Sequence, residues 1–144
     1  MTCDKPIRFL GLDFGDKTIG VAVACPDSRV ATGVTTLLRD DPLALRASLK
    51  ALKTFIKSYG ITHVVLGYPL YLDGTPSAQS VKTAAFKEKL ERYIKTVVVN
   101  LWDERLSTQA VSRVISNRDK IDEMAAVYIL QGYLDARNRS LKSY

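Results

Sequence analysis

Apolar residues recur along the chain with two different periods, which separate predicted strands from predicted helices. Short runs of apolar and β-branched residues are typical of buried strands. The first three runs are joined by short turn-forming segments, so we expect them to form an antiparallel meander. The predicted strands are Arg8–Phe14, Ile19–Ala24, Val30–Leu38, Thr62–Gly67 and Thr96–Leu101.

Four other segments show the helical spacing of apolar residues or a residue that favours helix N-termini. Asp41 is a predicted N-cap, with Pro42 at the first helical position, and Gly60 is a predicted stop. Pro at the first position, or Ser or Asp as N-cap, marks the other three starts. These helices are predicted from Pro76 through Leu90, from Ser107 to about Ile115 and from Asp122 to about Arg137.

The order of these elements predicts an α/β fold. Strands four and five each follow a helix, so each is expected to join the sheet through a right-handed parallel crossover. We therefore expect a mixed five-stranded sheet, with three antiparallel strands followed by two parallel ones, and helices on both faces. A chain of 144 residues is the length of one domain, so residues 1–144 are expected to form a single unit.

Polar residues follow three of the predicted strands. Asp13 ends the first strand, the loop 68–75 follows the fourth, and Asp103 and Glu104 follow the fifth. In sheets of this kind, ligand sites form outside the carboxyl ends of the parallel strands. We expect all these residues to lie at one edge of the sheet.

Charge and composition narrow the class of protein. Hydrophobic residues make up 47% of the chain, which argues against disorder. No window approaches the roughly 20 apolar residues of a membrane span, and no secretory signal is visible, so we expect a cytoplasmic protein. Lys and Arg number 21 against 15 Asp and Glu, a net charge of +6, which favours nucleic acid as the partner.

Few cysteine and histidine residues are available for chemistry. Cys3 and Cys25 are too few for a disulfide framework, and His63 is the only histidine. Zinc sites built from clustered Cys and His are therefore excluded. Any metal chemistry must use carboxylates, which suit hard cations such as magnesium or manganese.

Three acidic positions are candidates for such a site. Asp13 ends an apolar strand, where an unpaired carboxylate is costly, and Gly15 and Lys17 leave room beside it for a phosphate group. Neighbouring side chains of an extended segment point to opposite sides, so at most one of Asp103 and Glu104 points into a site beside strand one. Spacing alone leaves that choice open.

The sequence leaves two roles for Asp122 equally open, a helix N-cap and a site carboxylate. It precedes an apolar helical run and is expected to be its N-cap. On the helical face that it shares with two alanines, it is also placed to bring a carboxylate near Asp13.

Other side chains are candidates for holding nucleic acid. Cationic and hydroxyl groups position phosphate backbones, and aromatic rings stack on unpaired bases. Each of these side chains could instead have a purely structural role, as a solvated charge, a helix cap or a packed ring. The candidates are Lys17, Arg105, Ser107 and Thr108 for phosphate, and Tyr68 for a base.

Four segments of the chain form a recognisable set of motifs. They are residues 12–23 (LDFGDKTIGVAV), 64–75 (VVLGYPLYLDGT), 103–108 (DERLST) and 121–135 (IDEMAAVYILQGYLD). In this order they resemble the YqgF/RuvX family, the ribonuclease-H-like nucleases of precursor 16S ribosomal RNA, and the resemblance covers about residues 8–135.

The resemblance implies a ribonuclease-H-like fold and a magnesium-dependent endonuclease. It implies Asp13, Glu104 and Asp122 as the catalytic acids, and thereby selects Glu104 over Asp103. Related junction resolvases usually carry their second acid at the end of strand four. This chain has Gly67, Tyr68 and Pro69 there, so the second acid is expected from strand five.

The leading functional hypothesis is a nuclease that processes the 5′ end of the small-subunit ribosomal RNA precursor. Its expected partner is structured precursor RNA on the assembling small ribosomal subunit, and the protein is expected to be a monomer or weak homodimer. One alternative is a Holliday junction resolvase, which should be a stable dimer. Another is a catalytically weak RNA-binding assembly factor. A sugar-kinase-like ATPase is excluded, because it needs two such domains.

Overall fold

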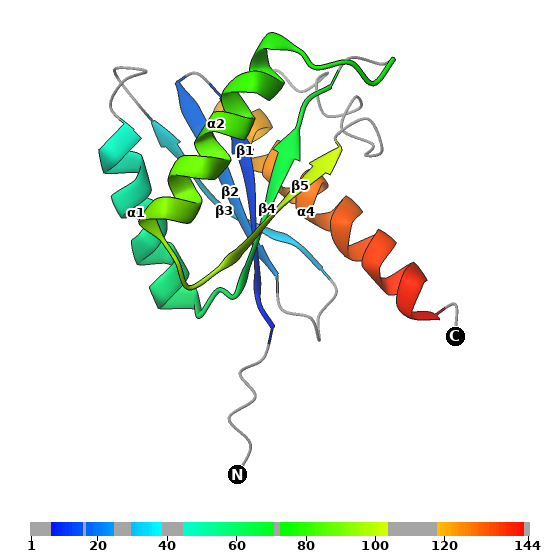
Figure 1. Cartoon of the computed structure of the whole chain (residues 1–144). Coiled ribbons are helices and arrows are strands. Elements are labelled where there is room, and N and C mark those ends of the chain that lie inside the picture. The colour runs from blue at the N-terminus through cyan, green and yellow to red at the C-terminus, as the bar shows by residue number, and fades with distance from the viewer. Residues whose placement is uncertain are drawn as a thin grey trace.

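The computed structural model describes residues 7–15, 17–24, 30–38, 45–70, 73–103 and 118–142, without the side chains of 118–123 and 138–142. Within these residues the chain forms five strands and three helices (Figure 1). The strands are β1 (Phe9–Phe14), β2 (Thr18–Ala24), β3 (Thr32–Leu38), β4 (His63–Tyr68) and β5 (Val98–Asp103). The helices are α1 (Leu45–Tyr59), α2 (Ala78–Tyr93) and α4 (Arg118–Lys142).

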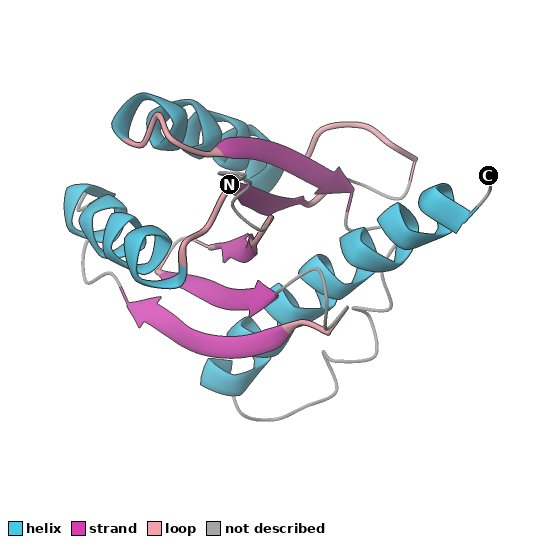
Figure 2. Ribbon diagram, turned by 90° about the horizontal axis from the view of Figure 1, so that it is seen from below, coloured by secondary structure: helices cyan, strands magenta, loops and turns pink. Residues whose placement is uncertain are grey.

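The strands form one mixed sheet in the order β3-β2-β1-β4-β5. β1 pairs antiparallel with β2, and β2 with β3, whereas β1, β4 and β5 run parallel. Figure 2 shows α1 and α2 on one side of the sheet and α4 on the other. The predicted fold class, including the meander and helices on both faces, is confirmed.

Alternation along β1 builds two apolar cores. Leu10, Leu12 and Phe14 point toward α1 and α2, and the ring of Phe14 stacks on Phe86 of α2 at 4.2 Å between centroids. Phe9 belongs to the second core, under α4. β1 is therefore buried on both faces, and each fully buried Leu or Phe side chain contributes about 1.5–3 kcal/mol by leaving water.

Gly11 allows α4 to approach the sheet closely. A Cβ atom at Gly11 would lie 2.7 Å from Cβ of Leu130 and 3.1 Å from the carbonyl oxygen of Ala126. The first distance is shorter than carbon atoms tolerate, and neither contact is with the flexible end of a side chain. α4 therefore rests on the backbone of β1 at this point.

We expect Gly11→Ala to lower the free energy of unfolding by about 1–3 kcal/mol, because the added methyl group forces α4 away from β1. Urea denaturation measures the change. Gly132→Ala is the matched control, since its Cβ would meet only the Trp102 indole, at 3.2 Å, and alanine favours the helix. Equal losses in both variants would show that close approach at Gly11 does not matter.

Two helix starts differ from the sequence-based predictions. α2 begins at Ala78 with Ser77 as N-cap, so Pro76 lies before the cap and is not the first helical residue. The Ser77 hydroxyl accepts a hydrogen bond from the Ser80 backbone N–H at 3.0 Å, and the Ser80 hydroxyl accepts one from the Ser77 N–H at 2.8 Å. This reciprocal capping decides the start.

α4 begins at Arg118, so the prediction that Asp122 is its N-cap is wrong. Asp122 lies in the second turn. The preceding turn is polar and contains no helix breaker, and apolar periodicity alone does not reveal such a turn. The helix also continues to Lys142, beyond the predicted end at Arg137. The predicted cap at Asp41 and the predicted helix 107–115 lie outside the described residues.

The fifth strand is displaced toward higher residue numbers. It covers Val98–Asp103, where Thr96–Leu101 was predicted, because α2 is followed by a turn after its C-cap, Ile94. Asp103 is therefore the last residue of the strand. Among the described helices, none has the length and apolar character needed to cross a bilayer.

Candidate functional site

The carboxyl ends of the three parallel strands lie at one edge of the sheet, which we call the carboxyl edge. β1 ends at Phe14, β4 at Tyr68 and β5 at Asp103. Leu12 is in register with Leu66, Gly67 with Trp102, and Tyr68 with Asp103. The sequence-based expectation that these ends meet is therefore confirmed for the described residues.

Asp13 is the penultimate residue of β1, opposite Gly20 of β2. It shares the α4 face of the sheet with Phe9 and Gly11, since side chains alternate along the strand. The residue is half-buried. A carboxylate in this position loses part of its hydration, which favours a cation or hydrogen-bond donors beside it.

Two hydrogen bonds fix the backbone of the carboxyl edge near Asp13. The turn between β1 and β2 is closed by a hydrogen bond from the Gly15 N–H to the Thr18 carbonyl at 2.8 Å, and Lys17 is exposed in this turn. On the other face, the Gln79 side-chain amide donates to the Phe14 carbonyl at 2.8 Å. That bond ties the start of α2 to the end of β1.

The loop after β4 is also tied to α2. The Ser77 hydroxyl donates a hydrogen bond to the Pro69 carbonyl. The N-terminus of α2 is thus held against the ends of both β1 and β4. Sequence reasoning had not identified Gln79 or Ser77. The Gln79 bond joins residues 65 positions apart, and the Ser77 bond reaches a loop carbonyl eight positions away.

The pleat of β5 separates Trp102 from Asp103. Trp102 lies on the α4 face, where its ring meets Tyr133 edge-on at 5.9 Å between centroids. Asp103 follows it and therefore lies on the opposite face, as does Tyr68 beside it. Asp103 and Tyr68 reach the carboxyl edge but not the face of the sheet that carries Asp13.

Trp102 is a further residue of this edge that the sequence did not single out. Its indole N–H is buried and has no hydrogen-bond partner within the described part of the chain. The indole packs against the backbone at Gly132 of α4. It therefore helps to position α4 against the face that carries Asp13.

The structure does not describe the other predicted site residues. Glu104, Arg105, Ser107 and Thr108 lie outside the described residues, and so does the side chain of Asp122. The structure thus places Asp13, Lys17 and Tyr68 at the carboxyl edge, with Tyr68 on the other face from Asp13. Among the side chains that are described, no three acidic, His or Cys groups gather as a metal site.

His63 lies at the amino end of β4, away from the carboxyl edge. Its Nδ1 is 2.8 Å from the Thr62 hydroxyl. Burial, and to a lesser degree the positive charge of Arg137, lowers the pKa of His63 and keeps the ring neutral at neutral pH. These contacts describe a structural residue.

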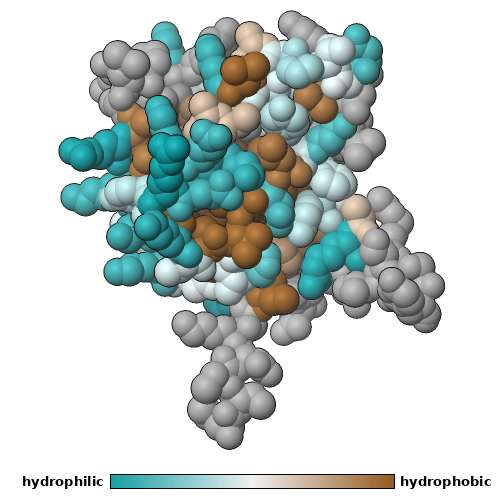
Figure 3. All heavy atoms as spheres, in the orientation of Figure 1, coloured by the Kyte–Doolittle hydropathy of each residue, from teal (hydrophilic) through white to brown (hydrophobic). Residues whose placement is uncertain are grey.

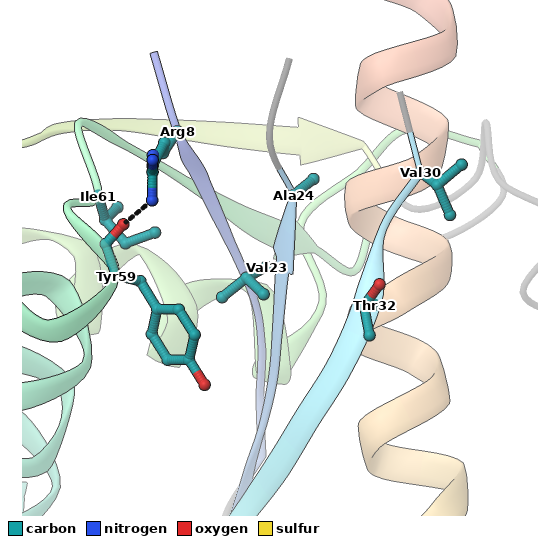
Figure 4. Close-up of a pocket in the computed structure, with 7 residues that line it drawn as sticks. All are labelled: Arg8, Val23, Ala24, Val30, Thr32, Tyr59 and Ile61. Carbon is teal, nitrogen blue, oxygen red and sulfur yellow. Dashed lines mark hydrogen bonds between the residues drawn. The ribbon is translucent and has the colours of Figure 1, made fainter. Parts of the chain in front are cut away.

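A pocket of about 140 Å³ opens at the same amino end of the sheet (Figure 4). It is lined mostly by apolar side chains, such as Val23 and Ile61, with Arg8 and Tyr59 at its side. The Arg8 guanidinium donates to the Tyr59 carbonyl at 3.2 Å, and this bond joins the residue before β1 to the end of α1. The pocket is therefore separate from the edge that carries Asp13.

Comparison with solved structures defines the class of fold. The Thermus thermophilus RuvC structure in complex with a Holliday junction substrate matches with a TM-score of 0.56 over 91% of this chain and 95% of that chain, at 12% sequence identity. A second Thermus thermophilus RuvC structure matches with a TM-score of 0.54 over 91% of this chain and 96% of that chain, at 12% identity. The chain has the ribonuclease-H-like fold of the RuvC nucleases.

Comparison with known sequences identifies the family. A family model described as "RuvX: Holliday junction resolvase" matches residues 7–136. A Myxococcus xanthus protein named "Putative pre-16S rRNA nuclease" is 43% identical over 138 residues, which cover 90% of this chain and 89% of that protein. A Rhodopseudomonas palustris protein of the same name is 45% identical over 134 residues, covering 88% and 80%. The chain belongs to the RuvX family, as the resemblance implied.

Proposed function

We propose that the chain is a divalent-metal-dependent endonuclease that processes the 5′ end of precursor 16S ribosomal RNA. Membership of a nuclease family supports phosphodiester hydrolysis, and the name shared by close relatives supports this RNA as substrate. The observation that carries the proposal is the position of Asp13, half-buried at the carboxyl edge of the central strand and facing α4.

The geometry of β5 supports Glu104 as the second acid. Trp102 lies on the α4 face, together with Asp13, and Asp103 lies on the opposite face. If the backbone stays extended for one more residue, position 104 returns to the face of Asp13. This alternation favours Glu104 over Asp103, the choice that spacing alone had left open.

The path of α4 supports Asp122 as the third acid. The helix meets Phe9 through Tyr133, and Gly11 through Ala126 and Leu130, so it runs toward the carboxyl edge as residue numbers fall. Position 122 is one turn before Ala126, on the same helical face and about 6 Å further along the axis. The next step along β1 from Gly11 is Asp13.

This acid set suits Mg²⁺ or Mn²⁺, because carboxylate oxygens are the ligands that hard divalent cations prefer. Bound there, such an ion would activate water and stabilise the leaving oxygen of a phosphodiester. In this proposal Lys17, Arg105, Ser107 and Thr108 hold phosphate groups, and Tyr68 stacks on an unpaired base.

The biological setting follows from this substrate. We place the protein in the cytoplasm, on structured precursor RNA of the assembling small ribosomal subunit, with residues 1–144 acting as one nuclease domain. A monomer or weak homodimer suffices for a single cut. The alternative function is a Holliday junction resolvase, the activity that the description of the family model names. A stable dimer is expected only for this alternative.

A cleavage assay separates these functions. The purified protein is incubated with a precursor 16S RNA 5′ segment or a four-way DNA junction, in magnesium, in manganese or in EDTA. We expect RNA cleavage in either metal and none in EDTA. Cleavage of the junction alone would establish the resolvase, and tight RNA binding without cleavage in either metal would contradict the nuclease assignment.

A further inference from the structure

Positive charge is concentrated in one layer of the fold. Residues 45–95, which contain α1, β4 and α2, carry nine Lys and Arg against three Asp and Glu. Their net charge of +6 equals that of the whole chain, so the remaining residues balance to zero. α1 and α2 cover the face of the sheet opposite α4 (Figure 2). The excess charge of these residues therefore lies on that side of the sheet.

Four of these cations form a stripe along α1, which we call the α1 stripe. It consists of Arg46, Lys50, Lys53 and Lys57, spaced by four, three and four residues, so all four lie on one side of the helix. All four are exposed, and α1 contains no acidic residue. Figure 3 shows hydrophilic side chains gathered on the α1 side of the molecule.

The α1 stripe is not balanced by nearby carboxylates. Within the described part of the chain, no Asp or Glu forms an ion pair with any of its four members. Lys53 lies over the ring of Tyr93 in α2, 5.4 Å from the centroid, and this contact keeps its charge at the surface. Four like charges at one-turn spacing repel each other, which costs helix stability unless an anionic partner compensates.

The length and regularity of the α1 stripe match a phosphate backbone. From residue 46 to residue 57 the helix rises about 16 Å, over which one strand of a duplex presents roughly five phosphates. None of the four residues of the stripe is aromatic, and one face of the Tyr93 ring beside it carries Lys53. This surface therefore suits the backbone of double-helical nucleic acid better than unpaired bases.

Two other kinds of partner fit less well. Membrane-surface helices insert apolar residues, but Leu49, Leu52 and Ile56 of α1 are buried in the protein core. Protein interfaces are enriched in aromatic residues at their centres and depleted in Lys, whereas three of the four residues of the stripe are Lys.

We infer that the α1 stripe is a second RNA-contacting surface, which holds the phosphate backbone of a duplex arm beside the cleavage site. This inference rests on the proposed function. α1 begins near the carboxyl edge, because its other end leads directly into the start of β4. An arm leaving the site can therefore pass over that edge and continue along α1 from Arg46 to Lys57.

Binding at several salt concentrations tests the inference. We would compare the wild-type protein with the Lys50→Gln, Lys57→Gln double variant, using a precursor 16S RNA 5′ segment that contains a stem-loop, in EDTA so that no cleavage occurs. Each lost phosphate contact lowers the slope of log K against log salt by about one. Between about 50 and 200 mM salt, wild type should therefore lose about tenfold more affinity than the variant.

Two controls separate local contacts from overall charge. Arg139→Gln with Lys142→Gln removes the same charge from α4 and should leave the slope unchanged. Lys50→Arg with Lys57→Arg keeps the charge and should bind like wild type. Thermal unfolding of each variant shows whether the fold is intact.

The possible outcomes are distinct. Equal slope changes in the α1 and α4 variants would overturn the inference. A parallel assay with phosphatidylserine vesicles tests the membrane alternative. An α1 variant that loses vesicle binding but binds RNA like wild type would also overturn the inference. Failure of the proposed function shows up separately, as absence of metal-dependent cleavage by the wild-type protein. The α1 variant should still cleave saturating RNA at the wild-type rate and show a raised KM.

Discussion

Asp13→Asn is expected to reduce metal-dependent RNA cleavage by at least about 10³-fold, a loss typical when a group acting on the reacting atoms is removed. Asparagine has nearly the same shape as aspartate but carries no charge and is a poor ligand for Mg²⁺. We expect the thermal unfolding midpoint to stay close to that of wild type, because Asp13 is only half-buried. Single-turnover cleavage of the RNA segment and a thermal melt measure the two effects.

Asp73→Asn is the matched control for this prediction. Asp73 lies in the loop after β4 and accepts hydrogen bonds from the Thr75 N–H at 3.0 Å and from the Thr75 hydroxyl at 2.7 Å. Asparagine forms the same kind of turn, so cleavage should be unchanged. Wild-type cleavage by Asp13→Asn would exclude Asp13 from the metal site, and an unfolded variant would show that its role is structural.

Adjacent acids at the end of β5 are expected to behave differently. Glu104→Gln and Asp122→Asn should each reduce cleavage by roughly the same 10³-fold factor as Asp13→Asn, whereas Asp103→Asn should retain wild-type cleavage. The reason is the strand pleat, which places Asp103 on the face of the sheet opposite Asp13. The same single-turnover assay measures all three variants, with RNA binding in EDTA as a check on substrate affinity.

The reverse result is equally informative. Loss of cleavage in Asp103→Asn with full activity in Glu104→Gln would mean that the second acid is Asp103 and reaches the site around the end of β5, and that position 104 takes no part. Asp122 lies in the second turn of α4 and is not its cap, so a lower unfolding midpoint in Asp122→Asn could not be attributed to a lost N-cap. Full cleavage by Asp122→Asn would remove this residue from the acid set.

Much of the site's surroundings follows from features that are local along the chain. The apolar run that ends at Asp13 identifies a buried strand, and the two later strands that follow helices must run parallel to it. Those two facts together predict that Asp13 and the ends of β4 and β5 share an edge. The four family segments then name the acids, although the structure describes the side chain of only the first of them.

Other features depend on which local contacts form and on contacts between distant segments. The start of α2 is decided by reciprocal hydrogen bonds between Ser77 and Ser80, and its position against β1 by the bond from Gln79 to Phe14, 65 residues away. The start of α4 at Arg118 was missed because its first turn is polar. The α1 stripe is visible in the sequence as a spacing, but its exposure is known only once Leu49, Leu52 and Ile56 are seen to form the buried side of the helix.

By itself, therefore, the sequence determined the fold class, the direction of the strands, the placement of Asp13 and Asp103 at one sheet edge and the family. These depend on residue periodicity and on short connections, which are local properties. The tertiary structure decided on which face Asp103 and Tyr68 lie, how closely α4 approaches Gly11, and on which face the excess charge gathers. Each of these depends on strand register and helix packing, where one residue of displacement moves a side chain to the other face of the sheet.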